Sequence, residues 1–228
     1  MPNLRVATYN IRHGLGLDGK VDLARVGQVI RELEVDLIGL QEVDKGRRRS
    51  GNVDQARCLA ELMNMRYIFA PAISRGTSQY GNAILSRYPI LFWESFPLKS
   101  IRESRILVRA VIEVSGNRLN FYTTHLGLSR RERMRHINDV VLPVISSGKR
   151  TILTGDFNCR PDSPEMQILT GVLHDACPPA GQHTFPSHNP KERIDFVMYS
   201  GSWDTVESLV FPADASDHNP VVTVFTWT

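Results

Sequence analysis

Residues 4–41 read LRVATYNIRHGLGLDGKVDLARVGQVIRELEVDLIGLQ, and they hold a strand, a helix and a second strand in succession. Leu4–Ile11 is β-prone and ends in polar residues. Asp22 then caps a segment whose apolar residues recur at helical spacing. Residues 36–41 (DLIGLQ) form a short apolar run of the buried-strand type. The helical apolar positions are Leu23, Val26, Ile30 and Leu33.

The strand–helix order repeats once, with a helix expected near Val53–Met63, and then gives way to strands separated by turns. Ser115-Gly116-Asn117 predicts the turn of a hairpin. Ser129 with Glu132 is typical of a capping box, so we expect a helix from there toward Ile145. Ser163 and Pro164 predict the start of another helix, which holds Met166 and Leu169. The expected strands are Tyr67–Ala70, Ala83–Ser86, Ile90–Glu94, Ile106–Val114, Arg118–Thr124, Thr151–Thr154, Arg193–Tyr199, Val206–Phe211 and Val221–Trp227.

Strand–helix units at the two flanks enclose a run of consecutive antiparallel strands. This order favours an α/β fold, a four-layer α/β/β/α sandwich of two mixed sheets flanked by helices. The chain of 228 residues is long enough to bury one sizeable core, and it contains no repeat, linker or low-complexity tract. We therefore expect a single catalytic domain over residues 1–228.

Composition excludes several classes of protein. Hydrophobic residues make up 42% and charged residues 22%, which is typical of a globular chain and not of a disordered one. No stretch approaches the roughly 20 apolar residues that cross a bilayer, and the N-terminus lacks the pattern of a signal peptide. Cys58, Cys159 and Cys177 are odd in number and widely spaced, so we expect a reducing, cytoplasmic location.

The net charge of +3 is compatible with a polyanionic partner without requiring one. Two basic clusters could contact the phosphates of a nucleic acid, or could simply be solvated surface. They are Lys45, Arg47, Arg48 and Arg49, and Arg130, Arg131, Arg133 and Arg135.

Acids and amides occur where several of the expected strands end. Hydrolysis of a phosphate ester brings an oxygen nucleophile to a centre surrounded by negative oxygens, and a hard dication on carboxylates is the usual solution. Asp156 and Asn158 alternate along an extended segment and so share one face. His218, next to Asp217, could accept a proton from water near neutral pH. The strand-end residues are Asn10, Glu42, Asp156, Asn158, Asp217 and His218.

Each of these motifs alone is weak, but their order along the chain resembles that of the endonuclease/exonuclease/phosphatase superfamily, in its deoxyribonuclease/sphingomyelinase-like branch. The resemblance extends from Leu4 to about Thr226. It is specific for the superfamily and much less so for substrate. The motifs are Thr8-Tyr9-Asn10, Gln41-Glu42, Thr124-His125-Leu126, Gly155-Asp156-Phe157-Asn158, Ile194-Asp195-Phe196 and Ser216-Asp217-His218.

The resemblance implies a metal site and a set of catalytic roles. Glu42 is expected to be the principal ligand of Mg²⁺, or of Mn²⁺, with Asn10 and Asp217 nearby. His218 is expected to be the general base, oriented by the carboxylate of Asp195.

The same resemblance assigns roles around the phosphate. Asp156 and Asn158 would position nucleophile and phosphate. His125 would stabilise the transition-state oxygens or protonate the leaving oxygen.

The chain also departs from its apparent relatives. In pancreatic deoxyribonuclease a glutamate supports the second histidine, whereas Asn82 stands at the matching position here. An amide can orient His125 but cannot stabilise its charge equally well, and Asn82 is also expected to contact the substrate. The Tyr-x-Pro-Asn segment typical of abasic-site endonucleases is absent, which disfavours that activity. Arg105 and Arg49 are further candidates for contacts with substrate phosphates.

Three functions remain open from the sequence. The first is a Mg²⁺-dependent phosphodiesterase of nuclease type that binds nucleic acid. The second is a hydrolase of a phospholipid headgroup or an inositol phosphate, although no long apolar insertion for docking on a bilayer is present. The third is an inactive binding module, which the intact acids and His218 disfavour because buried acids cost desolvation. The oligomeric state is open as well.

Overall fold

The computed structural model describes residues 3–146, 150–177, 182–203 and 205–226, and its framework is a pair of six-stranded sheets. The first sheet has the spatial order β11-β12-β1-β2-β4-β3, and the second has the order β5-β6-β7-β8-β10-β9. Strands of the first sheet are β1 (Asn3–Asn10), β2 (Leu37–Lys45), β3 (Arg66–Arg75), β4 (Ser78–Ser86), β11 (Thr205–Val210) and β12 (Val221–Thr226). Strands of the second are β5 (Ile90–Leu98), β6 (Arg105–Val114), β7 (Asn117–His125), β8 (Thr151–Asp156), β9 (His174–Asp175) and β10 (Asp195–Ser200).

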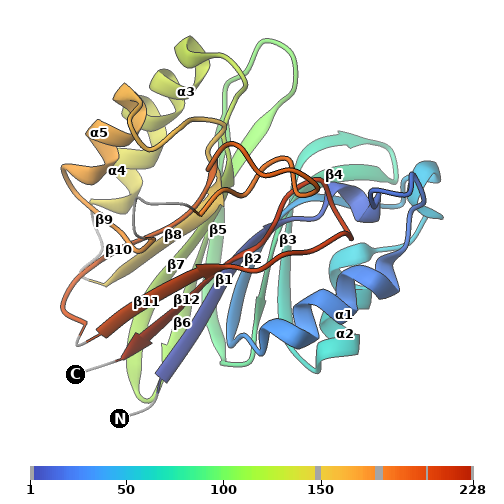
Figure 1. Ribbon diagram of the computed structural model, residues 1–228, viewed down its shortest axis with the longest axis horizontal. Coiled ribbons are helices and arrows are strands. Elements are labelled where there is room, and N and C mark those ends of the chain that lie inside the picture. The colour runs from blue at the N-terminus through green and yellow to red at the C-terminus, as the bar shows by residue number, and fades with distance from the viewer. Residues whose placement is uncertain (1–2, 147–149, 178–181, 204, 227–228) are drawn as a thin grey trace.

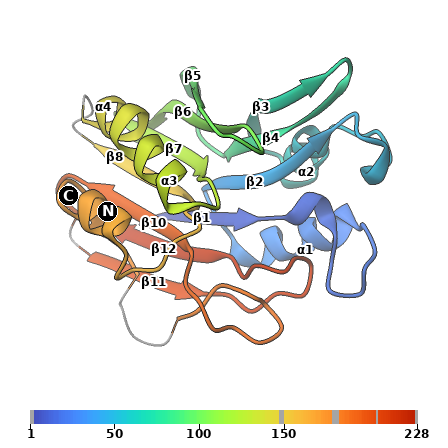
Figure 2. The same cartoon turned by 90° about the horizontal axis from the view of Figure 1, so that it is seen from above.

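Helices cover the outer face of each sheet (Figures 1 and 2). The first sheet carries α1 (Leu23–Leu33) and α2 (Gln55–Met63), while the second carries α3 (Arg130–His136), α4 (Leu142–Ile145) and α5 (Pro164–Thr170). A π-helical turn, Ile137–Val141, joins α3 to α4 without a break. The expected four-layer α/β/β/α sandwich is therefore confirmed.

Apolar side chains fill three layers of core. One cluster lies between the two sheets, and the other two lie between each sheet and its helices. The sheets approach closely at Gly39, where an added Cβ would lie 2.3 Å from Thr154 Oγ1 and 2.5 Å from Thr123 Oγ1. A neighbouring polar network crosses the same interface, because Gln41 Nε2 donates to the hydroxyls of Thr8 and Thr123.

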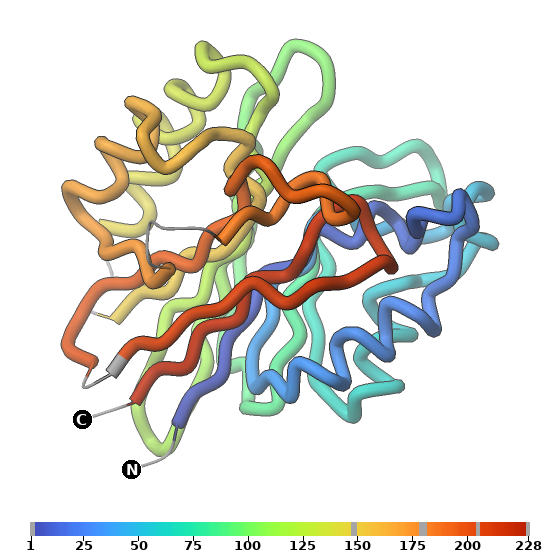
Figure 3. Tube along the Cα trace, in the orientation of Figure 1, coloured from blue at the N-terminus to red at the C-terminus, as the bar shows by residue number. Residues whose placement is uncertain are grey.

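Strand direction gathers the ends of the motif-bearing strands at one edge of the sandwich. β1 and β2 are parallel, as are β7 and β8, so their carboxyl ends point the same way within each sheet. β10 is antiparallel to β8 and pairs Asp195 with Asp156, so its first residue lies at the end of β8. β12 is antiparallel to β1, and both chain termini lie together at the opposite end of the sandwich (Figure 3).

Most element boundaries agree with the sequence expectations to within a few residues. The hairpin turn is confirmed, since Val114 pairs with Asn117 and both Ser115 and Gly116 have positive φ. The helix expected near Val53 begins at Gln55, because Asp54 caps it by accepting from the backbone N–H of Arg57.

Other ends differ from expectation, because β3, β4 and β5 each extend several residues beyond the expected strands. The strand expected from Arg193 starts at Asp195. Trp227, the expected end of the last strand, lies outside the described residues. Among the helices that the structure describes, none combines the length and apolar character needed to span a bilayer.

Candidate active site

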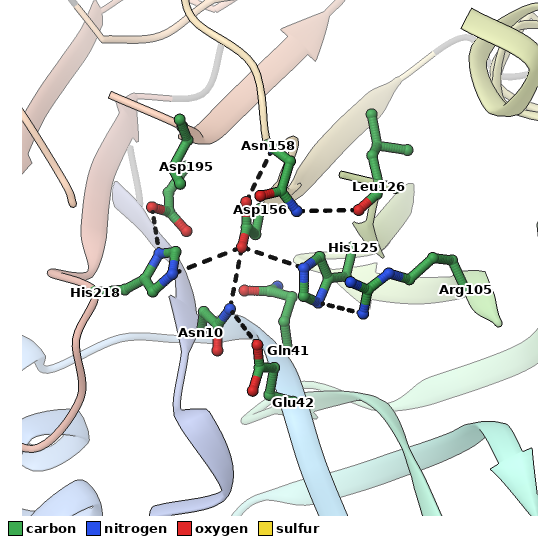
Figure 4. Close-up of polar contacts among 12 residues, drawn as sticks. Asn10, Gln41, Glu42, Arg105, His125, Leu126, Asp156, Asn158, Asp195 and His218 are labelled. Carbon is green, nitrogen blue, oxygen red and sulfur yellow. Dashed lines mark hydrogen bonds and ion pairs between the residues drawn. The ribbon is translucent and has the colours of Figure 1, made fainter. Parts of the chain in front are cut away.

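Most of the residues singled out in the sequence meet at one edge of the sandwich, where β1, β7 and β8 end and β10 begins (Figure 4). Asp156 lies at their centre and its side chain is only 2% exposed. Its Oδ2 accepts from Asn10 Nδ2 at 3.1 Å and lies 3.3 Å from His125 Nε2 and 3.8 Å from His218 Nε2. Its Oδ1 accepts from the backbone N–H of Asn158 at 2.9 Å. Burial raises the pKa of this carboxyl group, although nearby His218 works in the opposite direction.

His218 and Asp195 form a buried imidazole–carboxylate pair. His218 Nδ1 lies 2.9 Å from Asp195 Oδ2, so this nitrogen donates its proton and Nε2 faces Asp156. Burial on its own lowers the pKa of His218, but the carboxylates of Asp195 and Asp156 outweigh burial and raise it to about 10. Phe185 packs against the imidazole with ring centroids 4.8 Å apart. The ring is thus held in one orientation by a charge on one side and an aromatic face on another.

Glu42 reaches the site through an irregularity in β2. The pairing of β2 with β4 shifts between Leu40 and Val43, and Glu42 has a φ of +58°, a conformation that non-glycine residues seldom adopt. Its Oε1 accepts from Asn10 Nδ2 at 3.3 Å. Burial raises the pKa of Glu42, and the hydrogen bond from Asn10 partly offsets this effect. Strained backbone of this kind persists at sites where a side chain has to be aimed.

Asn158 is also held in the left-handed region, with a φ of +51°. Its backbone N–H donates to Asp156 and its Nδ2 donates to the carbonyl of Leu126 at 3.1 Å. The first bond closes the turn after β8, and the second ties that turn to the residue that follows β7.

Arg105, and not Asn82, orients His125. Arg105 Nη1 lies 3.2 Å from His125 Nδ1, and since a guanidinium can only donate, that ring nitrogen accepts and Nε2 carries the proton. Arg105 is held in turn by the carboxylate of Glu103. Burial, together with the charges of Arg105 and His218, holds the pKa of His125 well below its ordinary value. Asn82 is buried and donates instead to the carbonyl of Ile106, so the contact expected between it and His125 is replaced.

Asp217 and Arg49 lie at the margin of this cluster. Asp217 Oδ2 pairs with Arg12 Nε at 3.3 Å, and the charge of Asp217 contributes to the raised pKa of Glu42. Arg49 forms two hydrogen bonds to the buried carboxylate of Asp44 and stacks over the ring of Tyr80. Its guanidinium is therefore already paired, although it lines the same cavity as Glu42.

The two basic clusters are only partly available to a ligand. Arg47 lies 3.5 Å from Asp44, in the same ion-pair group as Arg49. Arg133 pairs with the buried carboxylate of Glu165 at 2.8 Å and so serves the packing of α3 on α5. In the parts of the chain that the structure describes, three members of the second cluster are exposed and make no ion pair: Arg130, Arg131 and Arg135.

A cavity of about 500 Å³ opens over the cluster. Sequence reasoning missed several residues that line this cavity. Tyr80, Phe185 and Glu103 belong to no motif that would have marked them as part of a site. Glu103 adjoins Arg105 along the chain, which is the one local hint for it. The lining includes Glu42, Tyr80, Glu103, Arg105, His125, Asp156, Phe185 and His218.

The donor atoms fit a hard dication. Ligand atoms of Asp156, Asp195 and His218 lie within 4.8 Å of one another. Asp195 Oδ1 is buried without a hydrogen-bond partner, and burial raises the pKa values of Glu42 and Asp156. Crowded carboxylates with an unused oxygen are the donor set that Mg²⁺ or Mn²⁺ prefers.

Comparison of the sequence with known proteins identifies a family and a relative of similar length. A sequence model described as "Endonuclease/Exonuclease/phosphatase family" matches residues 7–218. The Escherichia coli K12 protein named "Uncharacterized protein YbhP" is 23% identical over 96% of this chain and 94% of its own length.

Two solved structures share the fold over nearly the whole of both chains. A mannosyl-6-phosphatase from Bacteroides thetaiotaomicron has a TM-score of 0.79 at 21% identity, covering 98% of this chain and 100% of its own. Truncated TDP2 from Caenorhabditis elegans has a TM-score of 0.74 at 19% identity, covering 98% and 97% respectively.

Proposed function

Because the chain belongs to the endonuclease/exonuclease/phosphatase family and is a phosphoric ester hydrolase, we propose that it is a Mg²⁺-dependent phosphodiesterase of nuclease type. The observation that carries this proposal is that His218 and Asp156 line one cavity side by side, while the buried carboxylate of Asp195 holds His218 from behind. A base held by a buried carboxylate, beside a cluster of hard oxygen donors, suits activation of water against a phosphate.

The dication would be held by Glu42 and Asn10, with Asp156 adjacent and Asp217 behind Arg12. A dication bound there would polarise the phosphate, and its positive charge would lower the raised pKa values of Glu42 and Asp156. Mn²⁺ has similar ligand preferences and is expected to substitute.

His218 Nε2 is the proton acceptor in this proposal. Its Nδ1 proton is committed to Asp195, so once the ring is neutral its lone pair lies on Nε2 and faces the cavity. The carboxylates of Asp195 and Asp156 raise the pKa of His218 to about 10, and a dication bound beside Asp156 would lower it again by offsetting their charge. Asp195 fixes this tautomer and stabilises the imidazolium that forms when the proton of water is taken up. Asp156 and the loop of Asn158 border the same space and position the nucleophile.

His125 acts as a neutral hydrogen-bond donor. Arg105 donates to its Nδ1, so the ring proton is on Nε2, which faces Asp156. When substrate binds, this N–H can donate to a phosphate oxygen in place of Asp156. The lowered pKa supports stabilisation of transition-state oxygens by His125 and speaks against protonation of the leaving group.

Nucleic acid is the proposed substrate class because cationic groups adjoin the cavity. Arg105 lines the cavity, and helix α3 carries three exposed arginines, Arg130, Arg131 and Arg135. The unpaired state of Cys58, Cys159 and Cys177 fits the cytoplasmic location proposed here.

The test is a turnover panel with bis-p-nitrophenyl phosphate, p-nitrophenyl phosphate, duplex and single-stranded DNA, RNA, sphingomyelin and inositol phosphates, in Mg²⁺, Mn²⁺ or EDTA. We expect diesters to be cleaved in preference to the monoester and EDTA to stop the reaction. His218→Ala should remove activity while leaving the circular dichroism spectrum unchanged. Faster turnover of the monoester, or of a sphingolipid or inositol phosphate, than of any nucleic acid would contradict the proposal.

A further inference from the structure

A second cavity of about 500 Å³ adjoins the active site and shares Arg105 with it. It opens between β3 and the loop that follows β5; these are the edge strands on the same side of the two sheets, and they lie against each other (Figure 2). Its polar walls are Lys99, Ser100, Ser104 and Arg105. The described residues that line it include no carboxylate side chain. We call this second cavity the flanking cavity.

Arg105 leaves a donor unused between the two cavities. The side chain is 7% exposed, and its Nη1 serves both the carboxylate of Glu103 and Nδ1 of His125. Its Nε is buried and has no hydrogen-bond partner. A buried guanidinium with a free N–H costs desolvation unless an acceptor arrives, and a phosphate oxygen is a geometrically matched acceptor.

Lys99 adds a second cation to the lining of the flanking cavity. It is exposed, and among the described residues it belongs to no ion pair. Its backbone is fixed, because its carbonyl oxygen lies 3.1 Å from Nε2 of the buried His136. The backbone of Lys99 is therefore anchored, while its ammonium group can turn toward a ligand.

The remaining walls of the flanking cavity are apolar. Pro71, Ala72, Pro97, Leu98 and Ile106 contribute them. A cavity with two cations, two hydroxyls, no acid and an apolar wall matches a phosphate attached to a sugar and base better than a simple anion.

We propose that the flanking cavity binds the phosphate next to the scissile one, so that the preferred substrate is a nucleic-acid strand with phosphates on successive nucleotides. This inference rests on the proposed function and deepens it. Arg105 would then contact both phosphates, while Lys99 would contact only the neighbouring one.

The test compares kcat/KM in Mg²⁺ for a thymidine dinucleotide and for the same dinucleotide with an added phosphate on one or the other terminal hydroxyl. We expect the added phosphate, at one end, to raise kcat/KM about fivefold, the effect of one partly exposed charge-assisted contact. Lys99→Met should remove this advantage, and Lys99→Arg should keep it. Turnover of bis-p-nitrophenyl phosphate, which has no second phosphate, should be unchanged in Lys99→Met.

Arg118→Met is the control, since Arg118 is also exposed but lies at the start of β7, away from the flanking cavity. It should behave as wild type toward every substrate. An advantage of the added phosphate that survives in Lys99→Met would overturn the flanking site while leaving the diesterase assignment intact. If a second phosphate raised kcat/KM through Lys99 for an inositol phosphate but not for the dinucleotide, the choice of nucleic acid as substrate would be overturned. Absence of any diester cleavage would instead refute the proposed function.

Discussion

Replacing Asp195 by asparagine tests the proton-transfer step most directly, because it changes charge without changing shape. Asp195 is 1% exposed, its Oδ2 lies 2.9 Å from His218 Nδ1, and its Oδ1 has no partner. An amide at this position has two orientations, and each harms the base in a different way.

With its NH₂ group toward His218, the amide would make Nδ1 an acceptor and place the ring proton on Nε2, where it blocks proton uptake from water. With its oxygen toward His218, the working tautomer survives, but the NH₂ group takes the place of Oδ1, which has no partner in the structure. A buried donor left unsatisfied costs about 1–3 kcal/mol. The second orientation also lacks the negative charge that stabilises the imidazolium.

We therefore expect Asp195→Asn to lower kcat about 10²- to 10⁴-fold, the range that a positioned general base contributes. KM should change little, since Asp195 is buried behind His218. The assay is absorbance at saturating Mg²⁺ with bis-p-nitrophenyl phosphate, and circular dichroism should show an intact fold. Asp139→Asn, an exposed position on the π-helical turn, is the control. If Asp195→Asn turns over within threefold of wild type while His218→Ala is inactive, the orienting role is wrong.

Three other predictions follow from the structure. Glu42→Gln should keep the fold but raise the Mg²⁺ concentration for half-maximal activity at least tenfold, because loss of a group around a metal weakens metal affinity by about 10- to 100-fold. A calorimetric titration that gives the wild-type affinity for Mg²⁺ would contradict the role of Glu42 as a ligand. Asp156 has a raised pKa in the fold, so it binds more protons there than in the unfolded chain, and its contribution to stability falls as the pH rises above 3.8. In EDTA, urea unfolding of Asp156→Asn should therefore lose less stability between pH 5 and pH 8 than wild type, and equal losses would count against a buried, strained carboxylate. Gly39→Ala should cost about 1–3 kcal/mol in urea unfolding by forcing a methyl group against Thr123, whereas Gly171→Ala, with looser surroundings, should cost much less.

Sequence periodicity was enough to predict the layers of the fold. The β-prone run of β1, the 3.6-residue spacing of α1 and the capping residue Asp22 are local properties, set by the backbone geometry of a few neighbouring residues. The helix expected near Val53 begins at Gln55 because the side chain of Asp54 caps it, and the sequence pattern alone leaves such a boundary undecided by a residue or two.

The candidate site was predictable as a set of residue types and not as a geometry. The acids and histidines could be named because phosphate chemistry needs them and because their order resembles that of a known superfamily. The partner of His125 could not be named: the sequence favoured Asn82, whereas the structure gives the contact to Arg105. The two candidates lie on neighbouring segments whose side-chain directions depend on packing between the sheets.

The polymer chain by itself determined which segments are strands and helices, and which groups capable of holding a proton or a cation stand at their ends. Only the tertiary structure decided that Arg47 and Arg49 fold back onto Asp44, that Arg133 serves Glu165, and that Arg105 has an unused donor between two cavities. The physical reason is range. Backbone preference acts over a few residues, whereas ion pairing and desolvation depend on groups that lie far apart along the chain and meet only when both sheets close.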